Sequence, residues 1–447
     1  MELPSRVEAA RPDGLELLGY SGLAAAAGIL ALGALERPSL VLLIVLGGTA
    51  VVVLLLRPDL ALLLVVATAP LEGAFSSGPA GISVTKLTGG LLFASFLFSL
   101  ARGKQRLVFE RGQALVLGIL AIALLSSLQA QDTSAALTTT SRYASFAAVY
   151  VIVTQLGQDR VLQRRIAWTL AASASVAAAL GLHGYLSGRQ DLATLPNVNS
   201  NDFAYLLATS LPLMFFLLGG PKLLRPFVLA AIGLVSAGTL LSLSRGALVG
   251  IAAGFLLFVL TDRRRVRVTL AAGALAAIGT IAVIQSNPQR FHEAISLKSQ
   301  VAQENISTRF GAWGAASRLA TDHPFLGVGP GNFQFYYNKL TGEPVGTLTL
   351  TVAHNALLDI GAELGLAAMF LLAAYLVLAF VRLTASLERG YGDPSFVRAL
   401  RISLTIAIVS AMFLSEQYFL PFWLFGGLAA AIWTDGERQA RQSSPAA

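Results

Sequence analysis

The stretch that decides the fold is "TVAHNALLDIGAELGLAAMFLLAAYLVLAF", residues 351–380. Its second half is a continuous apolar run, and a bilayer core takes about 20 such residues in a helix. Its first half places His354 beside Asn355, and the chain holds only 4 histidines in 447 residues. The stretch therefore predicts a membrane helix that follows an imidazole at one membrane surface.

The composition of the whole chain agrees with this interpretation. Hydrophobic residues make up 55% of the chain and charged residues 13%, with a mean hydropathy of +0.69. A soluble domain usually has about 25% charged residues. Only helices and closed barrels span lipid, and continuous Leu, Ala and Val runs lack the alternation of barrel strands. We expect an all-α polytopic membrane protein.

Hydropathy windows predict about 12–14 transmembrane helices, the third of them short. The fourteen candidates are 19–35, 38–56, 58–70, 83–101, 113–130, 142–156, 164–186, 202–219, 222–241, 245–260, 266–285, 366–384, 396–415 and 417–433. We expect three parts: a transmembrane bundle (1–285), an extracytoplasmic loop subdomain (286–352), and C-terminal transmembrane helices with a cytoplasmic tail (353–447).

The cysteine count and the first residues of the chain exclude some kinds of site and processing. The chain has no cysteine, which excludes disulfides and thiolate metal sites. Its first residues, "MELPSRVEAARPDG", lack a cleavage site after a short apolar core, so we expect no removable signal peptide.

Basic residues predict the orientation in the membrane. Counting alternately through fourteen spans places the basic loops on one side, together with both termini, and that side is cytoplasmic by the positive-inside rule. The net charge of +8 then reflects attraction to anionic membrane lipids and not a nucleic-acid partner. The basic loops are 102–112, 157–165, 221–226, 261–267 and 382–401.

The long outward loop, residues 286–352, precedes the histidine stretch. Connections of this length are usually functional or disordered. Its aromatic residues and Gly-Pro punctuation predict an ordered subdomain with one helix near 306–320. Its "GVGPGNF" segment (327–333) lacks the strand and helix that flank a phosphate loop, so we interpret it as turns.

Four basic residues lie on the outward side, where such residues should be scarce, three of them at helix ends and Arg309 within the long loop. Snorkelling to lipid phosphate would explain any one of them. Arg245 lies between two apolar spans with almost no loop, and an ionisable group at such a depth indicates function. The four are Lys86, Arg142, Arg245 and Arg309.

His354 and Asn355 have both a structural and a functional interpretation. Asn355 is a good helix N-cap, and His354 can simply lie at the interface. The four histidines show no metal-ligand spacing, so we expect no metal. At 100° per residue, Asp359 and Glu363 turn roughly 140° and 180° away from His354. A carboxylate partner would therefore come from elsewhere, for example Glu416 in "FLSEQYFLP".

The helix predicted from residue 202 begins on the same outer side. Asn199, Asn201 and Asp202 suit its N-terminus as caps, and such a terminus can also bind an anion. The centres of the predicted spans contain almost no Asp, Glu, Lys or Arg. Ion-coupled transporters place such groups near the midplane, so their absence favours surface chemistry over transport.

Four segments in this order resemble the O-antigen ligase and polymerase superfamily. They are "PNVNSNDFA" (196–204), "SRGA" (244–247), "RFGAW" through "HPFLGVGPGNF" (309–333) and "AHNALLDIGAELGL" (353–366). The resemblance covers roughly residues 190–380, and the earlier spans only in general character. The predicted span number exceeds that of a typical twelve-helix ligase.

The resemblance implies a membrane glycosyltransferase that uses no nucleotide sugar, no metal and no other cofactor. Such enzymes of the bacterial inner membrane move a glycan from undecaprenyl diphosphate to an acceptor hydroxyl on the periplasmic face. His354 would match the essential histidine of the family, and Arg142 and Arg245 its outward arginines. Lys86 and Arg309 are weaker matches.

The chemistry fits these residue types. Guanidinium groups bind phosphate oxygens in a bidentate fork and stabilise the charge that a diphosphate gains on leaving. A neutral imidazole suits a general base. A single displacement predicts inversion at the anomeric carbon. We expect Asn355, Asn201, Trp313 and Glu416 to position sugar or acceptor, and Trp313, Tyr336 and Tyr337 to offer rings for sugar stacking.

Several functions stay open at this point. A ligase would use lipid A-core as acceptor in lipopolysaccharide synthesis, a polymerase would use another repeat unit, and a relative would use a protein. From other classes, a transporter or lipid-linked sugar flippase and a non-catalytic scaffold are the alternatives.

Overall fold

The computed structural model describes residues 38–75, 84–105, 107–261, 266–341 and 352–443. The chain divides into two units, Met1–Arg57 and Pro58–Ala447. In the first unit, α2 (Pro38–Leu56) is an apolar helix with the predicted bounds. The span predicted at 19–35 lies outside the described residues.

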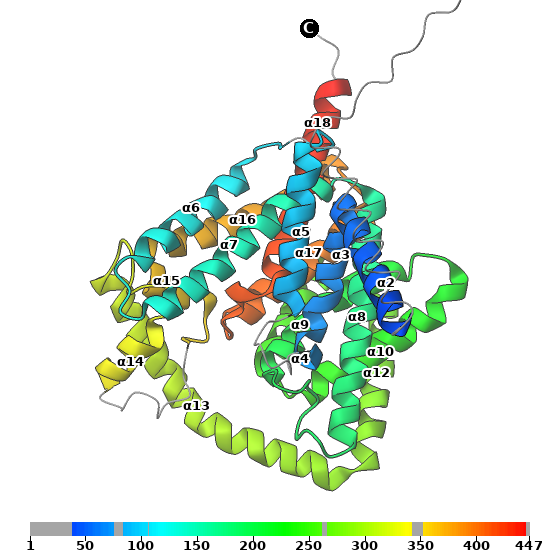
Figure 1. Cartoon of the computed structure of the whole chain (residues 1–447). Helices are drawn as coiled ribbons and strands as arrows, with labels where there is room; N and C mark the ends of the chain where they lie inside the picture. The colour runs from blue at the N-terminus through cyan, green and yellow to red at the C-terminus, as the bar shows by residue number, and fades with distance from the viewer. Residues whose placement is uncertain (1–37, 76–83, 106, 262–265, 342–351, 444–447) are drawn as a thin grey trace, which may run out of the picture. The chain divides into compact units, whose positions relative to one another are not determined.

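The second unit is built from helices, and the described residues contain no strand, which confirms the all-α prediction. In chain order its α-helices are α3 (Pro58–Thr68), α4 (Glu72–Phe75), α5 (Val84–Ala101), α6 (Arg111–Ser127), α7 (Thr133–Leu156), α8 (Arg160–Leu186), α9 (Ser200–Leu217), α10 (Arg225–Leu241), α11 (Arg245–Thr261), α12 (Val266–Ser286), α13 (Pro288–Asp322), α14 (Phe333–Thr341), α15 (Ala356–Leu364), α16 (Leu366–Arg389), α17 (Pro394–Ala411) and α18 (Leu420–Ser443) (Figure 1).

Five helical segments of the described residues are long and apolar enough to cross a membrane. They are α5, α8, α10 with the turn before it (Lys222–Leu241), α16 and α17. The predicted 12–14 spans also include α6 and α11, which are apolar but only 17 residues long, and the segment 19–35, which lies outside the described residues. The chain is a multi-pass membrane protein.

Three helices differ clearly from their predicted bounds, and one of them, α18, ends at Ser443 and not near 433. α7 begins at Thr133 and not near 142, because the side chain of Asp132 caps it by accepting a hydrogen bond from the Ala135 backbone N at 2.9 Å. The helix predicted at 306–320 is the centre of α13, which has 35 residues. Asn287 caps α13, and Pro288 occupies its first turn, where a missing N–H costs nothing.

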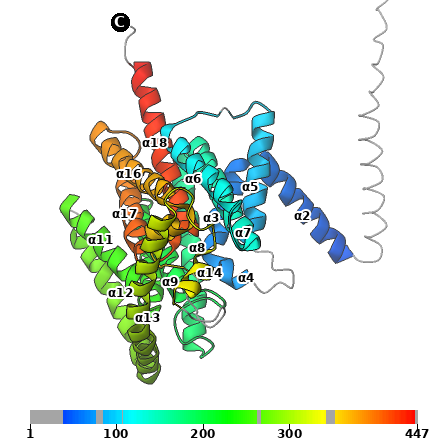
Figure 2. The ribbon, with the colours of Figure 1, turned by 90° about the vertical axis from the view of Figure 1, so that its left-hand side faces the viewer.

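The packing of the second unit brings distant segments together. α16, α17 and α18 pack against one another, and α18 also packs on α7 (Figures 1 and 2). α17 packs in addition on α9 and α11. In Figure 1, α13 runs along the lower edge of this unit from the end of α12 to α14 and α15. The C-terminal helices therefore form the centre around which the earlier ones are arranged.

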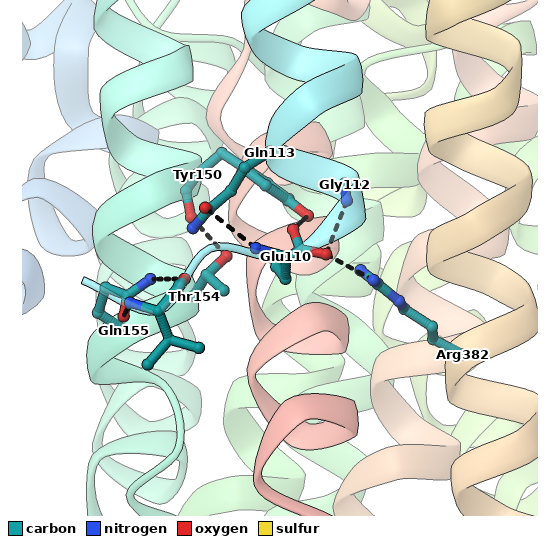
Figure 3. A network of polar contacts seen from close by, with 8 residues as sticks. Glu110, Gly112, Gln113, Tyr150, Thr154, Gln155 and Arg382 are labelled. Atoms are coloured by element: carbon teal, nitrogen blue, oxygen red, sulfur yellow. Dashed lines mark hydrogen bonds and ion pairs between the residues drawn. The ribbon is translucent and has the colours of Figure 1, made fainter. Parts of the chain in front are cut away.

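A buried network joins α6, α7 and α16 (Figure 3). Arg382 Nη2 lies 2.5 Å from Glu110 Oε2, with both side chains less than a tenth exposed. The Tyr150 hydroxyl donates to Glu110 Oε1 at 2.6 Å, and the Gly112 backbone N donates to Oε2 at 2.7 Å. Glu110 thereby caps α6 and fixes it to the two neighbouring helices.

The "GVGPGNF" segment forms turns up to Asn332, as predicted, but a helix does follow, because α14 begins at Phe333. These turns attach α15 to the bundle. The backbone N atoms of Val328 and Gly329 donate to the carbonyl oxygens of Ala362 and Glu363 at 3.0 and 2.9 Å. Gly327 has a φ of 62°, and a Cβ there would collide with the Glu363 backbone. Only glycine adopts this conformation so close to another backbone without strain.

α6 completes this attachment. The Ser126 hydroxyl donates to the carbonyl oxygens of Leu326 and Glu363 at 2.5 and 3.2 Å, and Gln129 Nε2 donates to Gly327 O at 3.1 Å. The turns of the long loop thus hold the helix that follows His354, which is their structural role.

Candidate active site

A cavity of about 1540 Å³ opens within the second unit. Its walls come from α5, α7, α9, α11 and α13, and from residues 413–420. Pockets for drug-sized ligands usually measure about 300–1,000 Å³, so this cavity has room for a larger molecule.

Most of the predicted site residues line this one cavity. The structure brings together Lys86 of α5, Arg142 of α7, Asn201 of α9, Arg245 of α11, Arg309 and Trp313 of α13, and His354. Asn355 is not among the lining residues. The side chain of Glu416 lies outside the described part of the structure.

The backbone at His354 is held in an uncommon conformation. Its φ is 52°, in the left-handed region that non-glycine residues seldom adopt. The residues on both sides are fixed: Ala353 N donates to Asp359 Oδ1 at 2.9 Å, and Asn355 caps α15. Such strain persists only where the surroundings impose it, and it gathers at functional sites.

Asn355 has a structural role at the start of α15. Its Oδ1 accepts from the backbone N atoms of Leu357 and Leu358, both at 3.1 Å. Its Nδ2 donates to the Met412 carbonyl oxygen at 3.1 Å, which ties the start of α15 to the end of α17. With both ends of the carboxamide engaged, Asn355 positions the His354 backbone.

One lysine in the cavity was missed by the sequence patterns. Lys298 of α13 lines the cavity, and its Nζ donates to the Ser200 hydroxyl at 2.9 Å. Burial lowers the pKa of Lys298, and the positive charges of Arg309 and Arg245 lower it further. Its spacing from Arg309 on the same helix was the signal that could have revealed it.

Arg245, Lys298 and Arg309, here called the cation cluster, lack an acidic partner. Within the described residues no carboxylate forms an ion pair with any of them. Burial lowers the pKa of Arg309, with Arg245 adding to the effect, and its buried Nε has no hydrogen-bond partner there. Unpaired like charges near one another are costly, so this arrangement favours an anionic ligand.

The His354 imidazole is neutral at pH 7 in this site. Burial, followed by the positive charge of Arg309, lowers the pKa of His354 to about 4. In the described structure its ring forms no hydrogen bond to another residue. The ring therefore keeps a lone pair available for a proton.

Arg142 reaches the cavity above an aromatic ring. Its guanidinium carbon lies 5.8 Å from the centroid of the Tyr418 ring, a cation–π contact. The Tyr418 hydroxyl donates to Glu363 Oε2 at 3.0 Å and so fixes that ring.

The two carboxylates of α15 are buried. Glu363 is 2% exposed and Asp359 is fully buried, with Asp359 Oδ2 accepting from Gln417 Nε2 at 2.7 Å. Neither carboxylate forms a hydrogen bond with the His354 ring.

Two of the three aromatic residues proposed for sugar stacking do not line the cavity. Tyr337 is 4% exposed and stacks on Phe333 in a small apolar core, so that part of the prediction is wrong. Tyr336 packs against His323 and Phe335. Trp313 does line the cavity, next to Phe310, which is 64% exposed and was not predicted.

Metal ligands do not gather in the described residues. No group of three or more His, Asp or Glu side chains that could hold a metal ion occurs among them. The charged residues of the cavity are mostly basic, with Glu72 and Asp202 as the acidic lining residues.

Comparison with known proteins finds a family match for one segment of the chain. Residues 228–373 match a family model described as O-antigen ligase. The segment includes Arg245, Arg309, His354 and the whole of α13. No curated protein matches the chain. The resemblance to the O-antigen ligase and polymerase superfamily is thereby confirmed, and it rests on the match over residues 228–373.

Proposed function

We propose that this protein transfers a glycan from undecaprenyl diphosphate to an acceptor hydroxyl at the periplasmic face of the bacterial inner membrane. The observation that carries the proposal is the cavity in which a neutral imidazole lies among unpaired basic side chains. The family match supports a glycan and lipid-linked substrates in general.

The reaction is a single displacement. The acceptor oxygen forms a bond to the anomeric carbon, the bond from that carbon to the diphosphate oxygen breaks, and the acceptor proton moves to His354. The diphosphate leaves on its prenyl chain with the electron pair, and the anomeric configuration inverts. A positioned base contributes about 10²–10⁴-fold to such a step.

The cation cluster stabilises the leaving diphosphate. Guanidinium groups bind phosphate oxygens through two parallel hydrogen bonds, and charge stabilisation in a preorganised site is usually the largest catalytic contribution. Arg142 and Lys86 line the same cavity and extend its positive lining toward α5 and α7.

The walls of the cavity suit the other parts of the donor. Leu92, Phe93 and Val149 provide apolar surface for a prenyl chain. Trp313 and Phe310 offer ring faces for a sugar, and neither ring is fully buried. The lining thus contains separate surfaces for lipid, diphosphate and glycan.

The acceptor defines the particular activity. We propose lipid A-core, which makes the protein an O-antigen ligase that acts without a metal or another cofactor. The same site with a second repeat unit as acceptor would make it a repeat-unit polymerase. A transporter or flippase would move the donor without forming a glycosidic bond.

Reconstitution tests the proposal. Purified protein in liposomes is supplied with undecaprenyl-diphosphate glycan and, in parallel, with lipid A-core, with a second donor molecule, or with no acceptor. We expect a lipid A-core conjugate whose yield is unaffected by EDTA and lost in His354→Ala and Arg245→Ala. Arg318→Ala, an exposed α13 residue outside the cavity, is the matched control. Movement of donor across the bilayer with no conjugate would refute transfer.

A further inference from the structure

The cation cluster brings together basic residues from two helices. Lys298 and Arg309 are eleven residues apart on α13. At 100° and 1.5 Å per residue they differ by only about 20° around the helix and lie about 16 Å apart along it. Both therefore face the cavity, into which Arg245 reaches from the start of α11.

No carboxylate of the described residues forms an ion pair with this cluster. Lys298 Nζ donates a hydrogen bond to the neutral Ser200 hydroxyl, so its positive charge is not compensated. Arg309 Nη1 makes only a long hydrogen bond of 3.4 Å to the Phe413 carbonyl oxygen. A diphosphate supplies several negative oxygens on one rigid group, which suits three basic side chains that converge on one volume.

His354 lies within the field of this cluster. The charged groups that line the cavity are mostly positive. They are Arg309 and Lys298 on α13, Arg245 on α11, Arg142 on α7 and Lys86 on α5, with Asp202 on α9 and Glu72 on α4 as the acidic ones. The carboxylates of α15 accept hydrogen bonds from Ala353, Gln417 and Tyr418. In the empty cavity a proton on the imidazole would thus meet positive charge.

This field makes His354 a weak base until an anion arrives. Its pKa of about 4 lies below the reference value near 6.5, and a good catalytic base has a pKa near the working pH. An opposite charge within about 4–6 Å moves a pKa by about 1–3 pH units in favour of the charged form. A bound diphosphate would therefore raise the proton affinity of the ring.

We propose that the diphosphate of the donor must occupy the cation cluster, with Lys298 as one of its ligands, before His354 can take the proton of the acceptor. The inference rests on the proposed function and deepens it, because it orders the two substrates: donor first, acceptor second. An acceptor that reaches an empty cavity meets no competent base.

Histidine NMR on the full chain tests this order without any transfer. The protein is labelled with ¹⁵N-histidine in nanodiscs, and the His354 signal is assigned by its loss in His354→Gln. Its pKa is then measured with and without undecaprenyl diphosphate that carries no glycan, and retention of this lipid is followed by native mass spectrometry. We expect the lipid diphosphate to raise the pKa by about one to three pH units.

Two variants of α13 locate the effect. In Lys298→Gln we expect weaker retention of the lipid diphosphate and a smaller rise at equal lipid. Arg318→Gln is the control, because Arg318 is nine residues from Arg309 and so about 180° around the helix. It should behave as the wild type.

The outcomes separate this inference from the proposed function. A His354 pKa that does not change with lipid diphosphate retained would overturn the donor-first order, even if glycan transfer is observed. Failure to retain the lipid would overturn it as well. A raised pKa together with no transfer to any acceptor would support the order and refute the transferase.

Discussion

The network of Glu110 and the cavity of His354 contain the same kinds of side chain in opposite arrangements. At Glu110 each carboxylate oxygen is engaged, by Arg382 and Gly112 on one side and by Tyr150 on the other (Figure 3). In the cavity the cation cluster has no ion-pair partner among the described residues.

This difference separates structural from functional charge. A buried ion pair is tolerable only when its hydrogen bonds are complete, and the pair at Glu110 meets that condition. Charges that a fold leaves unpaired in a cavity are costly to the empty protein and gain a partner when a ligand binds. The first region should therefore control stability and the second activity.

His354→Ala should give the largest effect that separates activity from stability. We expect transfer to fall by about 10²–10⁴-fold, the contribution of a positioned base, with little change in thermal unfolding. Transfer rates in liposomes and melting in detergent measure the two properties. Full transfer by the variant would remove His354 from the chemistry.

Arg382→Ala should produce the opposite pattern. Removing one partner leaves Glu110 buried and unpaired, which costs about 3–5 kcal/mol of stability. Melting in detergent should drop strongly, while the folded fraction keeps its rate per molecule. A double variant, Glu110→Leu with Arg382→Met, should recover much of the stability, because no buried charge then remains. A melting temperature equal to the wild type in the single variant would contradict the structural role.

Arg245→Lys tests what kind of charge the cavity needs. The lysine keeps the positive charge but loses the planar fork, and hydrogen bonds to charged groups contribute about 1.5–3 kcal/mol. We expect kcat/KM for the donor to fall by about 10–100-fold, since each 1.4 kcal/mol is a factor of about ten. An unchanged kcat/KM would mean that charge alone suffices there.

Asn355→Ala tests both properties, because Asn355 caps α15 directly after His354, the proposed base. Loss of its cap should cost about 0.5–2 kcal/mol of stability. Asn355→Ser should restore the cap but not the bond to the Met412 carbonyl oxygen. We therefore expect Ser to recover melting more than transfer. Equal recovery of both would show that the link to α17 does not position His354.

The pH dependence of stability gives the smallest expected effect. The pKa of His354 is about 4 in the folded protein and near 6.5 when unfolded, so between these values the unfolded chain binds more protons. Stability should thus fall as the pH is lowered from about 6.5 toward 4. His354→Gln should lose less stability over this window in melting experiments at pH 7.5 and 5. Identical losses would place the ring in solvent.

The sequence predicts most helices of this fold well and the polar ones poorly. α5, α8 and α16 begin within about four residues of their predicted starts, because an apolar run needs no partner to be recognised as a span. α13 was mostly missed, since a polar helix carries no hydropathy signal.

The sequence also predicts some of the candidate site residues better than others. Arg245 and His354 were singled out because each is an unusual residue at an apolar helix end. Lys298 looks ordinary in a polar segment, and its spacing from Arg309 becomes informative only once both are known to lie on one helix beside the cavity. The same path buries Tyr337, which the sequence presents as one more exposed loop aromatic.

The attachment of the "GVGPGNF" turns to α6 has a consequence for biosynthesis. Ser126 and its two acceptors are separated by 200 and 237 residues, so the ribosome must add nearly half the chain before that junction can close. The end of α6 must therefore wait for this contact until α15 has been made. A chain that terminates prematurely would stay open at this junction and become a substrate for membrane proteases.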